Sequence, residues 1–188
     1  MQVIELKGVK REILGKTFIK QLRKNEEVPG VLYGGAEPVH FTCTEKDFGK
    51  LIFTPHVHLI NLVIDGKSYN CILQDVQYHS VSDRVIHADF LLIHADKLVT
   101  IEIPVKLNGF SEGVKAGGKL QLEQRKLKVK ALPKFLPDTL DINIDKLGLG
   151  KGIQVKELAY ENLEVLNAKN SVVVSVKLTR AAKAAQGK

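Results

Sequence analysis

Apolar and polar residues alternate at the start of the chain. Residues 2–9 read Gln-Val-Ile-Glu-Leu-Lys-Gly-Val, and this period of two is typical of a strand with one buried face. The spacing then changes, because Phe18, Ile19 and Leu22 recur at helical intervals among basic residues. The pattern therefore predicts a strand over 2–9 and a short basic helix over 16–24.

Glycine-containing turns connect two further pairs of strands. An apolar run over 28–35 ends in two adjacent glycines, and residues 39–42 are expected to return beside it. The runs at 58–64 and 68–77 are rich in residues that favour strands. Asp65-Gly66 lies between them and is a dipeptide that adopts the positive φ angles of a two-residue hairpin turn. Two antiparallel hairpins are therefore expected.

A second short helix is expected between these hairpins. Thr44 precedes Asp47 by three positions, which resembles the spacing of a capping box, so the helix should cover 44–53. Residues 85–93 then form one more strand. The Ala95-Asp96-Lys97 segment that follows indicates a joint between two domains.

The second half of the chain contains short strand-like runs separated by glycines and prolines. The runs lie at 98–107, 119–131, 138–145, 153–158, 163–166 and 171–179. Regular short strands with turn signals predict a mostly β second domain. We therefore expect a mainly β chain with domains at 1–94 and 95–179. Residues 180–188 have too little apolar content to pack and are expected to form a mobile basic tail.

Composition is consistent with a soluble globular protein. The chain has 188 residues, of which 44% are hydrophobic and 26% charged, enough for one large or two small domains. No run reaches the roughly 18 apolar residues of a membrane span, and no secretory signal is evident, so a cytosolic protein without membrane association is expected. Cys43 and Cys71 are the only cysteines, which excludes a disulfide scaffold.

Basic residues outnumber acidic ones by seven, and their distribution is uneven. Residues 1–94 hold 11 basic and 11 acidic side chains, whereas 95–188 hold 17 and 10. Within the neutral first half, residues 7–24 carry seven basic side chains and only Glu12 in opposition. Such a basic patch either is a solvated helix face or attracts a polyanion such as nucleic acid.

Three catalytic or metal-binding patterns fail on inspection. Residues 113–119 fit the G-x-x-x-x-G-K skeleton of a phosphate loop, but Leu120 replaces the Ser or Thr that binds the metal ion. A flexible glycine turn is the expected structure there. The histidines and cysteines match no zinc spacing, and no nucleophile motif surrounds either cysteine. We expect no enzyme activity, no metal and no cofactor.

A polar cluster on two predicted strands is more informative. Gln74-Asp75-Val76-Gln77-Tyr78-His79 and His87-Ala88-Asp89-Phe90 crowd groups that donate and accept hydrogen bonds. Amides, imidazoles and carboxylates read base edges and 2′-hydroxyls, whereas lysines position phosphates. Gln74 and Gln77 share one face only if the strand bends or ends between them. Polar strand ends are ordinary, but beside the basic patch this cluster predicts an RNA-binding face.

Three segments carry a resemblance to a known family. GKTFIKQLRKNEEVPGVLYGG, ILQDVQYHSVSDRVIHADF and IPVKLNG with GVKAGGKL resemble the bacterial 5S rRNA-binding ribosomal protein twenty-five family, also called the general stress protein Ctc family. The resemblance covers nearly the whole chain and matches the long form. It implies a six-stranded β-barrel with two short helices that binds 5S rRNA, followed by a second, mostly β domain.

The resemblance also implies a structural role in the large ribosomal subunit, supporting translation on the cytoplasmic ribosome. The barrel would bind 5S rRNA, the second domain would contact neighbouring ribosomal protein or rRNA, and the chain would be a monomer off the ribosome. The implied RNA-binding residues are Lys10, Lys16, Lys20, Arg23, Tyr33, Gln74, Gln77, His79, His87 and Asp89.

The chain departs from the family pattern at several positions. Lys10 and Lys20 replace frequent arginines, which keeps the charge but loses bidentate geometry. Gln21 and Tyr78 stand where basic residues are common, and Ser80 replaces a common proline. An alternative function remains open at this point, a β-rich protein–protein adaptor whose basic surface is non-specific. The adaptor hypothesis predicts that the basic patch can be neutralised without loss of the partner.

Overall fold

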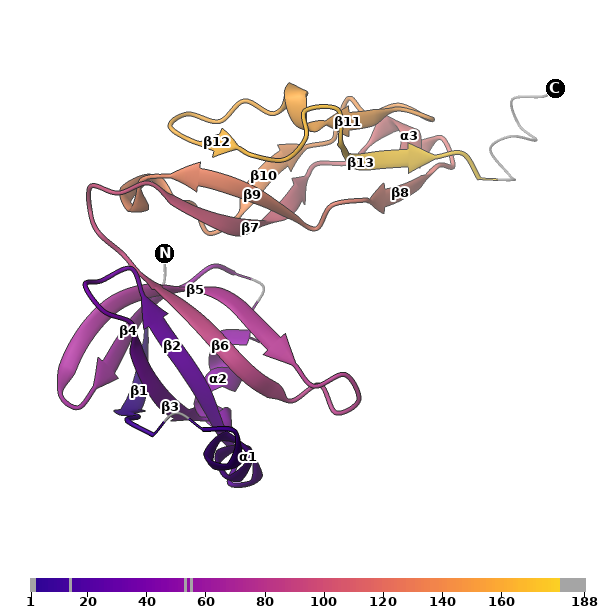
Figure 1. The fold of residues 1–188 in the computed structure, drawn as a ribbon. Helices are drawn as coiled ribbons and strands as arrows, with labels where there is room; N and C mark the ends of the chain where they lie inside the picture. Colours follow the sequence, from indigo (N-terminus) through magenta and orange to yellow (C-terminus); the bar gives the residue numbers. More distant parts are fainter. Residues whose placement is uncertain (1–2, 14, 53, 55, 180–188) are drawn as a thin grey trace. The chain divides into compact units, whose positions relative to one another are not determined.

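The computed structural model describes residues 3–13, 15–52, 54 and 56–179, and it divides into two compact units between Lys97 and Leu98 (Figure 1). The expected mobile tail at 180–188 lies outside the described residues. Each unit is mainly β, as the sequence predicts.

The described residues of the first unit form six strands and two helices. They are β1 (Val3–Lys10), α1 (Lys16–Lys24), β2 (Glu27–Tyr33), β3 (Val39–Thr44), α2 (Glu45–Ile52), β4 (Leu59–Ile64), β5 (Lys67–Tyr78) and β6 (Val85–Leu92). The six strands close into a barrel in the order β1-β3-β2-β6-β5-β4. The barrel and both helices are confirmed.

Strand β1 closes the barrel by pairing on two sides. Its residues from Val3 to Gly8 pair in parallel with β4, and its last two residues, Val9 and Lys10, pair antiparallel with β3. Asp65 and Gly66 form the turn between β4 and β5 with φ angles of 48° and 82°. The hairpin is therefore the one that the Asp-Gly dipeptide predicts.

The barrel core is built from the inward-facing residues of every strand together with α2. The ring of Phe90 on β6 packs against Phe41 of β3 and Phe48 of α2, with ring centroids 5.5 and 6.0 Å apart. All three rings are fully buried. Helix α2 begins after Thr44, whose hydroxyl donates to Asp47 at 2.7 Å. The bond joins the two side chains, whereas a capping box bonds each side chain to the main chain.

Residues 98–179 of the second unit form seven strands, one α-helix and two short 3₁₀ helices. They are β7 (Val99–Asn108), α3 (Glu112–Lys115), β8 (Lys119–Leu122), β9 (Lys126–Ala131), η1 (Pro133–Phe135), β10 (Leu140–Asn143), β11 (Gly152–Gln154), η2 (Val155–Glu157), β12 (Glu164–Val165) and β13 (Val172–Lys177). One sheet has the order β10-β7-β9-β12 and the other β11-β13-β8.

Three local predictions in the second unit were wrong. The run at 119–131 is two strands, β8 and β9, which belong to different sheets. The run at 153–158 leaves the strand after Gln154 and continues as η2. Residues 113–119 are not a simple glycine turn, because they include most of helix α3 and the first residue of β8. A Cβ on Gly113 would lie 2.7 Å from the main-chain carbon of Gly148. Close backbone packing, which local patterns do not report, explains that glycine.

Candidate nucleic-acid interface

Helix α1 carries its basic residues as one stripe. At 100° per residue, Lys16, Lys20, Arg23 and Lys24 fall within about 100° of the helix circumference, and all four are exposed. The opposite face buries Leu22 against the barrel. The first turn contains no acidic residue. The helix therefore presents an uninterrupted positive stripe to solvent.

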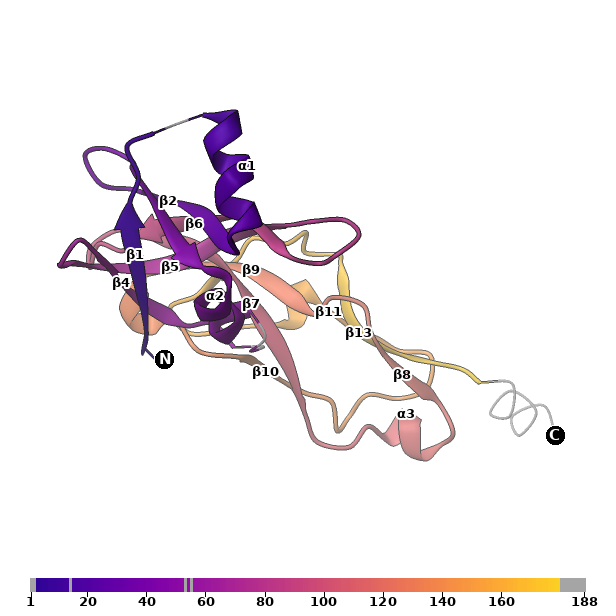
Figure 2. The ribbon, with the colours of Figure 1, turned by 90° about the horizontal axis from the view of Figure 1, so that it is seen from below.

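Arg23 attaches the last turn of α1 to β6. Its Nε and Nη2 donate to the carbonyl oxygen of Ile86 at 3.2 and 2.9 Å. Both views of the ribbon place α1 close to β2 and β6 (Figures 1 and 2). The positive stripe is thus held at the edge of the strand that continues into His87 and Asp89.

The outer face of three neighbouring strands collects most of the polar residues that the sequence singles out. In the register of β5 and β6, Gln77 is opposite His87 and Asp75 is opposite Asp89. On the other side of β6, Asp89 is level with Val31 of β2, two residues before Tyr33. We call Tyr33, Asp75, Gln77, His87 and Asp89 the polar face. Tyr33 lies beside the polar residues of β6 because β2 and β6 are parallel neighbours.

A bulge in β5 resolves the spacing of the two glutamines. The register between β5 and β6 shifts between Leu73 and Asp75, so Gln74 has no partner on β6. Leu73 packs against the barrel core, whereas Asp75 and Gln77 are exposed. The extra residue lets the strand keep its core face before the bulge and its polar face after it, which is the bend that the sequence requires.

The polar face combines two carboxylates with side chains that can donate hydrogen bonds. Nδ1 of His87 lies 3.2 Å from Oδ1 of Asp89, close enough for an ion pair when the imidazole is protonated, but the two atoms do not have the geometry of a hydrogen bond. Burial raises the pKa of the Tyr33 phenol, and the charges of Asp89 and Asp75 raise it further. Tyr33 therefore stays neutral and offers its hydroxyl as donor or acceptor. Like charges opposite each other, as in Asp75 and Asp89, favour a ligand that donates hydrogen bonds to them.

His79 and Lys10 lie apart from the polar face. His79 is in the turn beyond β5, and its Nδ1 accepts from the main-chain amides of Val81 and Ser82 at 3.4 and 3.3 Å. Shortly after this turn, Arg84 donates from Nε to Oε1 and from Nη2 to Oε2 of Glu45 at the start of α2, which makes a bidentate pair. Lys10 is at the end of β1, which β3 separates from β2. The structure therefore does not bring His79 or Lys10 together with the residues of the polar face.

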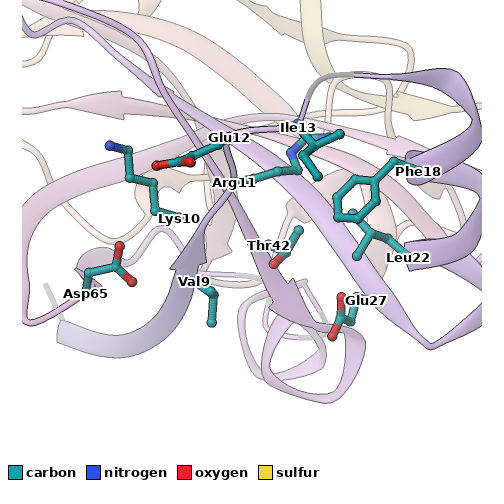
Figure 3. Close-up of a pocket in the computed structure, with 10 residues that line it drawn as sticks. All are labelled: Val9, Lys10, Arg11, Glu12, Ile13, Phe18, Leu22, Glu27, Thr42 and Asp65. Carbon is teal, nitrogen blue, oxygen red and sulfur yellow. The ribbon is translucent and has the colours of Figure 1, made fainter.

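Arg11 is a candidate residue that sequence reasoning counts only as one charge of the basic patch. It lines a pocket between β1 and α1, and its side chain extends toward Ile13 and Phe18 (Figure 3). Only 8% of its surface is exposed, and Nε and Nη1 are buried without a hydrogen-bond partner. Burial lowers the pKa of the guanidinium, although arginine stays charged at neutral pH. No local pattern separates this arginine from its exposed neighbours.

The cysteines and acidic groups do not suggest metal chemistry. Within the described ranges, no group of three or more His, Cys, Asp or Glu side chains is arranged to hold a metal ion. Cys43 and Cys71 lie in the barrel core, where burial raises the pKa of each thiol to about 12. Both are therefore protonated core residues rather than ligands or nucleophiles. Residues 113–119 are followed by a strand and not by the helix of a phosphate loop.

A closed barrel with a basic helix beside a polar strand face has the charge distribution expected of a nucleic-acid-binding protein. Comparison with known families agrees. Residues 6–90 match the ribosomal L25p family, and residues 98–180 match the C-terminal domain of ribosomal protein TL5. The chain therefore belongs to the ribosomal L25p family, in the form that carries this second domain. The family resemblance is confirmed.

The similarity to individual relatives extends over nearly the whole of both chains. The chain is 52% identical over 190 residues to a protein of Bacteroides fragilis, covering 98% of this chain and 97% of the relative. It is 50% identical over 193 residues to one of Parabacteroides distasonis, covering 100% of both. A Porphyromonas gingivalis relative is 50% identical over 187 residues, covering 98% of this chain and 97% of its own length. All three are named large ribosomal subunit protein bL25.

Family membership supports a structural role in the ribosome, in the cytoplasm, and not an enzymatic one. The relatives support the ribosomal role, whereas the prediction of the adaptor hypothesis, that the basic patch can be neutralised without loss of the partner, is left to experiment. Separately, none of the helices in the described part of the chain is both long and apolar enough to cross a membrane.

Proposed function

We propose that this chain binds 5S rRNA in the large ribosomal subunit through the positive stripe of α1 and the polar face of β2, β6 and β5. The observation that carries the proposal is the pair of hydrogen bonds from Arg23 to Ile86, because it holds the stripe beside His87 and Asp89. The names of the relatives, all large-subunit proteins, support the subunit.

The two surfaces have different tasks. Lys16 and Lys20 are exposed and make no ion pair within the described residues, so they are available to phosphate oxygens. The basic stripe therefore sets position and most of the salt-dependent affinity. Gln77, His87 and Asp89 offer donors and acceptors at fixed positions on a rigid barrel, which suits recognition of base edges and 2′-hydroxyls.

The shape of the surface suits RNA better than DNA. The deep major groove of an A-form helix excludes side chains, whereas its shallow minor groove displays 2′-hydroxyls. The outer strand face of the barrel, with a helix at its side, can meet such a groove without inserting an element. The carboxylates of Asp75 and Asp89 accept hydrogen bonds from base amino groups and 2′-hydroxyls, which offsets their repulsion by phosphates.

Arg11 has a role in this proposal that differs from that of the lysines. Its guanidinium lies in the pocket between β1 and α1 with two donor atoms unpartnered. A buried unsatisfied charge costs stability, so a phosphate or base that reached it would form strong charge-assisted hydrogen bonds. Lys10, Gln74 and His79 remain proposed contacts at the margins of the interface.

Each of the two domains is proposed to have its own partner. The first domain, 1–94, is proposed to bind 5S rRNA, and the second, 95–179, to contact neighbouring ribosomal protein or rRNA. The chain is proposed to be a monomer off the ribosome. Its barrel closes on itself, so no strand edge of the first unit calls for a second copy.

A binding titration tests the proposal. The full chain is titrated against 5S rRNA and against an unrelated duplex of equal length at two salt concentrations. We expect tight binding to 5S rRNA that exceeds binding to the control duplex at both. Equal affinity for both RNAs would contradict recognition by the polar face. Binding to 5S rRNA that survives neutralisation of Lys16, Lys20 and Lys24 would contradict the role of the stripe.

A further inference from the structure

Ile86 is an extra residue in β6, directly before the polar face. In the register of the two strands, Val85 is opposite Tyr78 but His87 is opposite Gln77, so Ile86 has no partner on β5. Residues two apart in an unbroken strand share a face. Val85 nevertheless packs against the barrel core, whereas His87 belongs to the polar face. The bulge at Ile86 therefore sets the face on which His87 lies.

Two arginine side chains fasten the segment that contains the bulge. Arg23 of α1 donates twice to the carbonyl oxygen of Ile86, the extra residue itself. Nε of Arg84, two residues earlier, lies 3.2 and 3.0 Å from the two carboxylate oxygens of Glu45, and its Nη2 also donates to that carboxylate. Each helix of the first unit thus supplies one contact to residues 84–86.

Glu45 and Arg84 are both attached to well-packed structure. The amide of Glu45 donates to the carbonyl of Glu26 at 2.9 Å, and the helix that Glu45 begins buries Phe48 in the barrel core. The carbonyl of Arg84 accepts from the amide of His79 at 2.8 Å, across the turn between β5 and β6. Their ion pair therefore joins a helix anchored in the core to the turn that precedes the bulge.

We propose that Glu45 and Arg84 are positioning residues for RNA recognition, because their ion pair holds the bulge at Ile86 so that His87 lies opposite Gln77. The inference rests on the proposed 5S rRNA function and deepens it, since neither Glu45 nor Arg84 is among the proposed RNA contacts. A carboxylate that acted only through its charge would weaken binding to any RNA, because phosphates repel it. A positioning role predicts the opposite effect of removing that charge on selective binding.

Glu45→Gln in the full chain separates the two roles. Affinities are measured for 5S rRNA and for an unrelated duplex of equal length. We expect the ratio of the two affinities to fall about two- to tenfold, the equivalent of one hydrogen bond. Glu37→Gln is the matched control, because Glu37 is an exposed acidic residue between β2 and β3 and its replacement removes the same charge. The control should leave the ratio unchanged.

A double-mutant cycle tests whether Glu45 and Arg84 act through one contact. Arg84→Gln should lower the ratio as Glu45→Gln does, and the double variant should lose no more selectivity than the weaker single variant. An exposed ion pair contributes little to overall stability, so every variant should stay folded. Additive losses would overturn the proposal. So would an unchanged ratio in Glu45→Gln, or an equal rise in both affinities.

Amide hydrogen exchange of the free chain gives a readout that needs no RNA. Glu45→Gln should speed exchange over residues 79–87, whereas Glu37→Gln should leave it unchanged. Unchanged protection of this segment in Glu45→Gln would overturn the proposal. A wild-type chain that binds both RNAs equally would contradict the proposed function instead, and the exchange experiment would still decide whether the ion pair holds the bulge.

Discussion

Arg23 and Ile86 are joined by two hydrogen bonds to one carbonyl oxygen, from Nε at 3.2 Å and from Nη2 at 2.9 Å. This contact links residues 63 positions apart and attaches the end of α1 to β6. It gives Arg23 a second task besides carrying charge, because it fastens the last turn of α1 to β6 while Leu22 of the same helix is buried. The contact also explains why arginine and lysine are not equivalent at this position.

Arg23→Lys separates these two tasks. The substitution keeps the positive charge but loses the paired donors, so affinity for 5S rRNA should fall about two- to tenfold, the range of a typical hydrogen-bond contribution, without a change in salt dependence. Lys20→Ala is the complement, because it removes an exposed charge and no described contact. Its salt slope should become shallower by about 0.7 to 0.9. Filter binding at four salt concentrations measures both, and a wild-type affinity for Arg23→Lys would refute the anchoring role.

Gln77→Ala should reduce selectivity rather than general affinity. Gln77 is exposed opposite His87, and its amide is assigned to recognition rather than to phosphates. The ratio of affinities for 5S rRNA and an unrelated hairpin should fall by about two- to tenfold, the equivalent of one hydrogen bond. Ser68→Ala, at the other end of β5, is the control and should leave the ratio unchanged. Equal losses for both RNAs would mean that Gln77 only supports electrostatic binding.

Gly30→Ala should destabilise the barrel. A Cβ at this position would lie 2.7 Å from Cζ of Phe41, a fully buried ring that also packs on Phe90. Overpacking of this kind costs about 1–3 kcal/mol, so thermal unfolding should shift downward by several degrees. Gly35→Ala is the control, because its Cβ would meet the side chain of Leu92 at an ordinary 3.5 Å. Equal melting temperatures for both variants would show that the core accommodates the methyl group.

The two thiols should be unreactive in the folded chain. Because burial raises both pKa values to about 12, roughly one thiol in ten thousand is ionised at pH 8, against about a quarter at the ordinary pKa near 8.5. Ellman's reagent should therefore react only after denaturant is added. The same shift favours the folded state below pH 8.5, and this contribution is lost as pH rises toward 12. Rapid labelling of the native chain would contradict the placement of these residues.

Local patterns predicted the first unit well because its elements are specified locally. The Asp65-Gly66 turn, the helical spacing of α1 and the alternation in β1 each depend on residues near one another in sequence. In the second unit, the run at 163–166 contains β12, but the division of the run at 119–131 into strands of two different sheets was not predicted, because sheet membership leaves no local periodic signal. Helix α3 was not predicted either, since its four residues depend on Ser111 and on the close approach of Gly113 to Gly148.

The candidate site, too, could be predicted from the sequence only where it depends on local features. The residue types of the polar face could be selected from the sequence. Gln74 and Gln77 can share one face only if the strand bends, and β5 contains a bulge next to Gln74. The burial of Arg11 and the attachment of Arg23 to Ile86 could not be predicted, because both depend on how α1 packs on the barrel. The sequence analysis did not include Asp75 among the RNA-binding residues, because only the register of β5 and β6 places it opposite Asp89.

Ultraviolet crosslinking of the full chain to 5S rRNA, followed by mass spectrometry of the crosslinked peptides, tests the central claim most directly. The proposed interface predicts crosslinks in the peptides that contain α1, the end of β2 near Tyr33, and the segments of β5 and β6 that carry Gln77 and His87. Crosslinks confined to residues 98–179, with none in these segments, would contradict it.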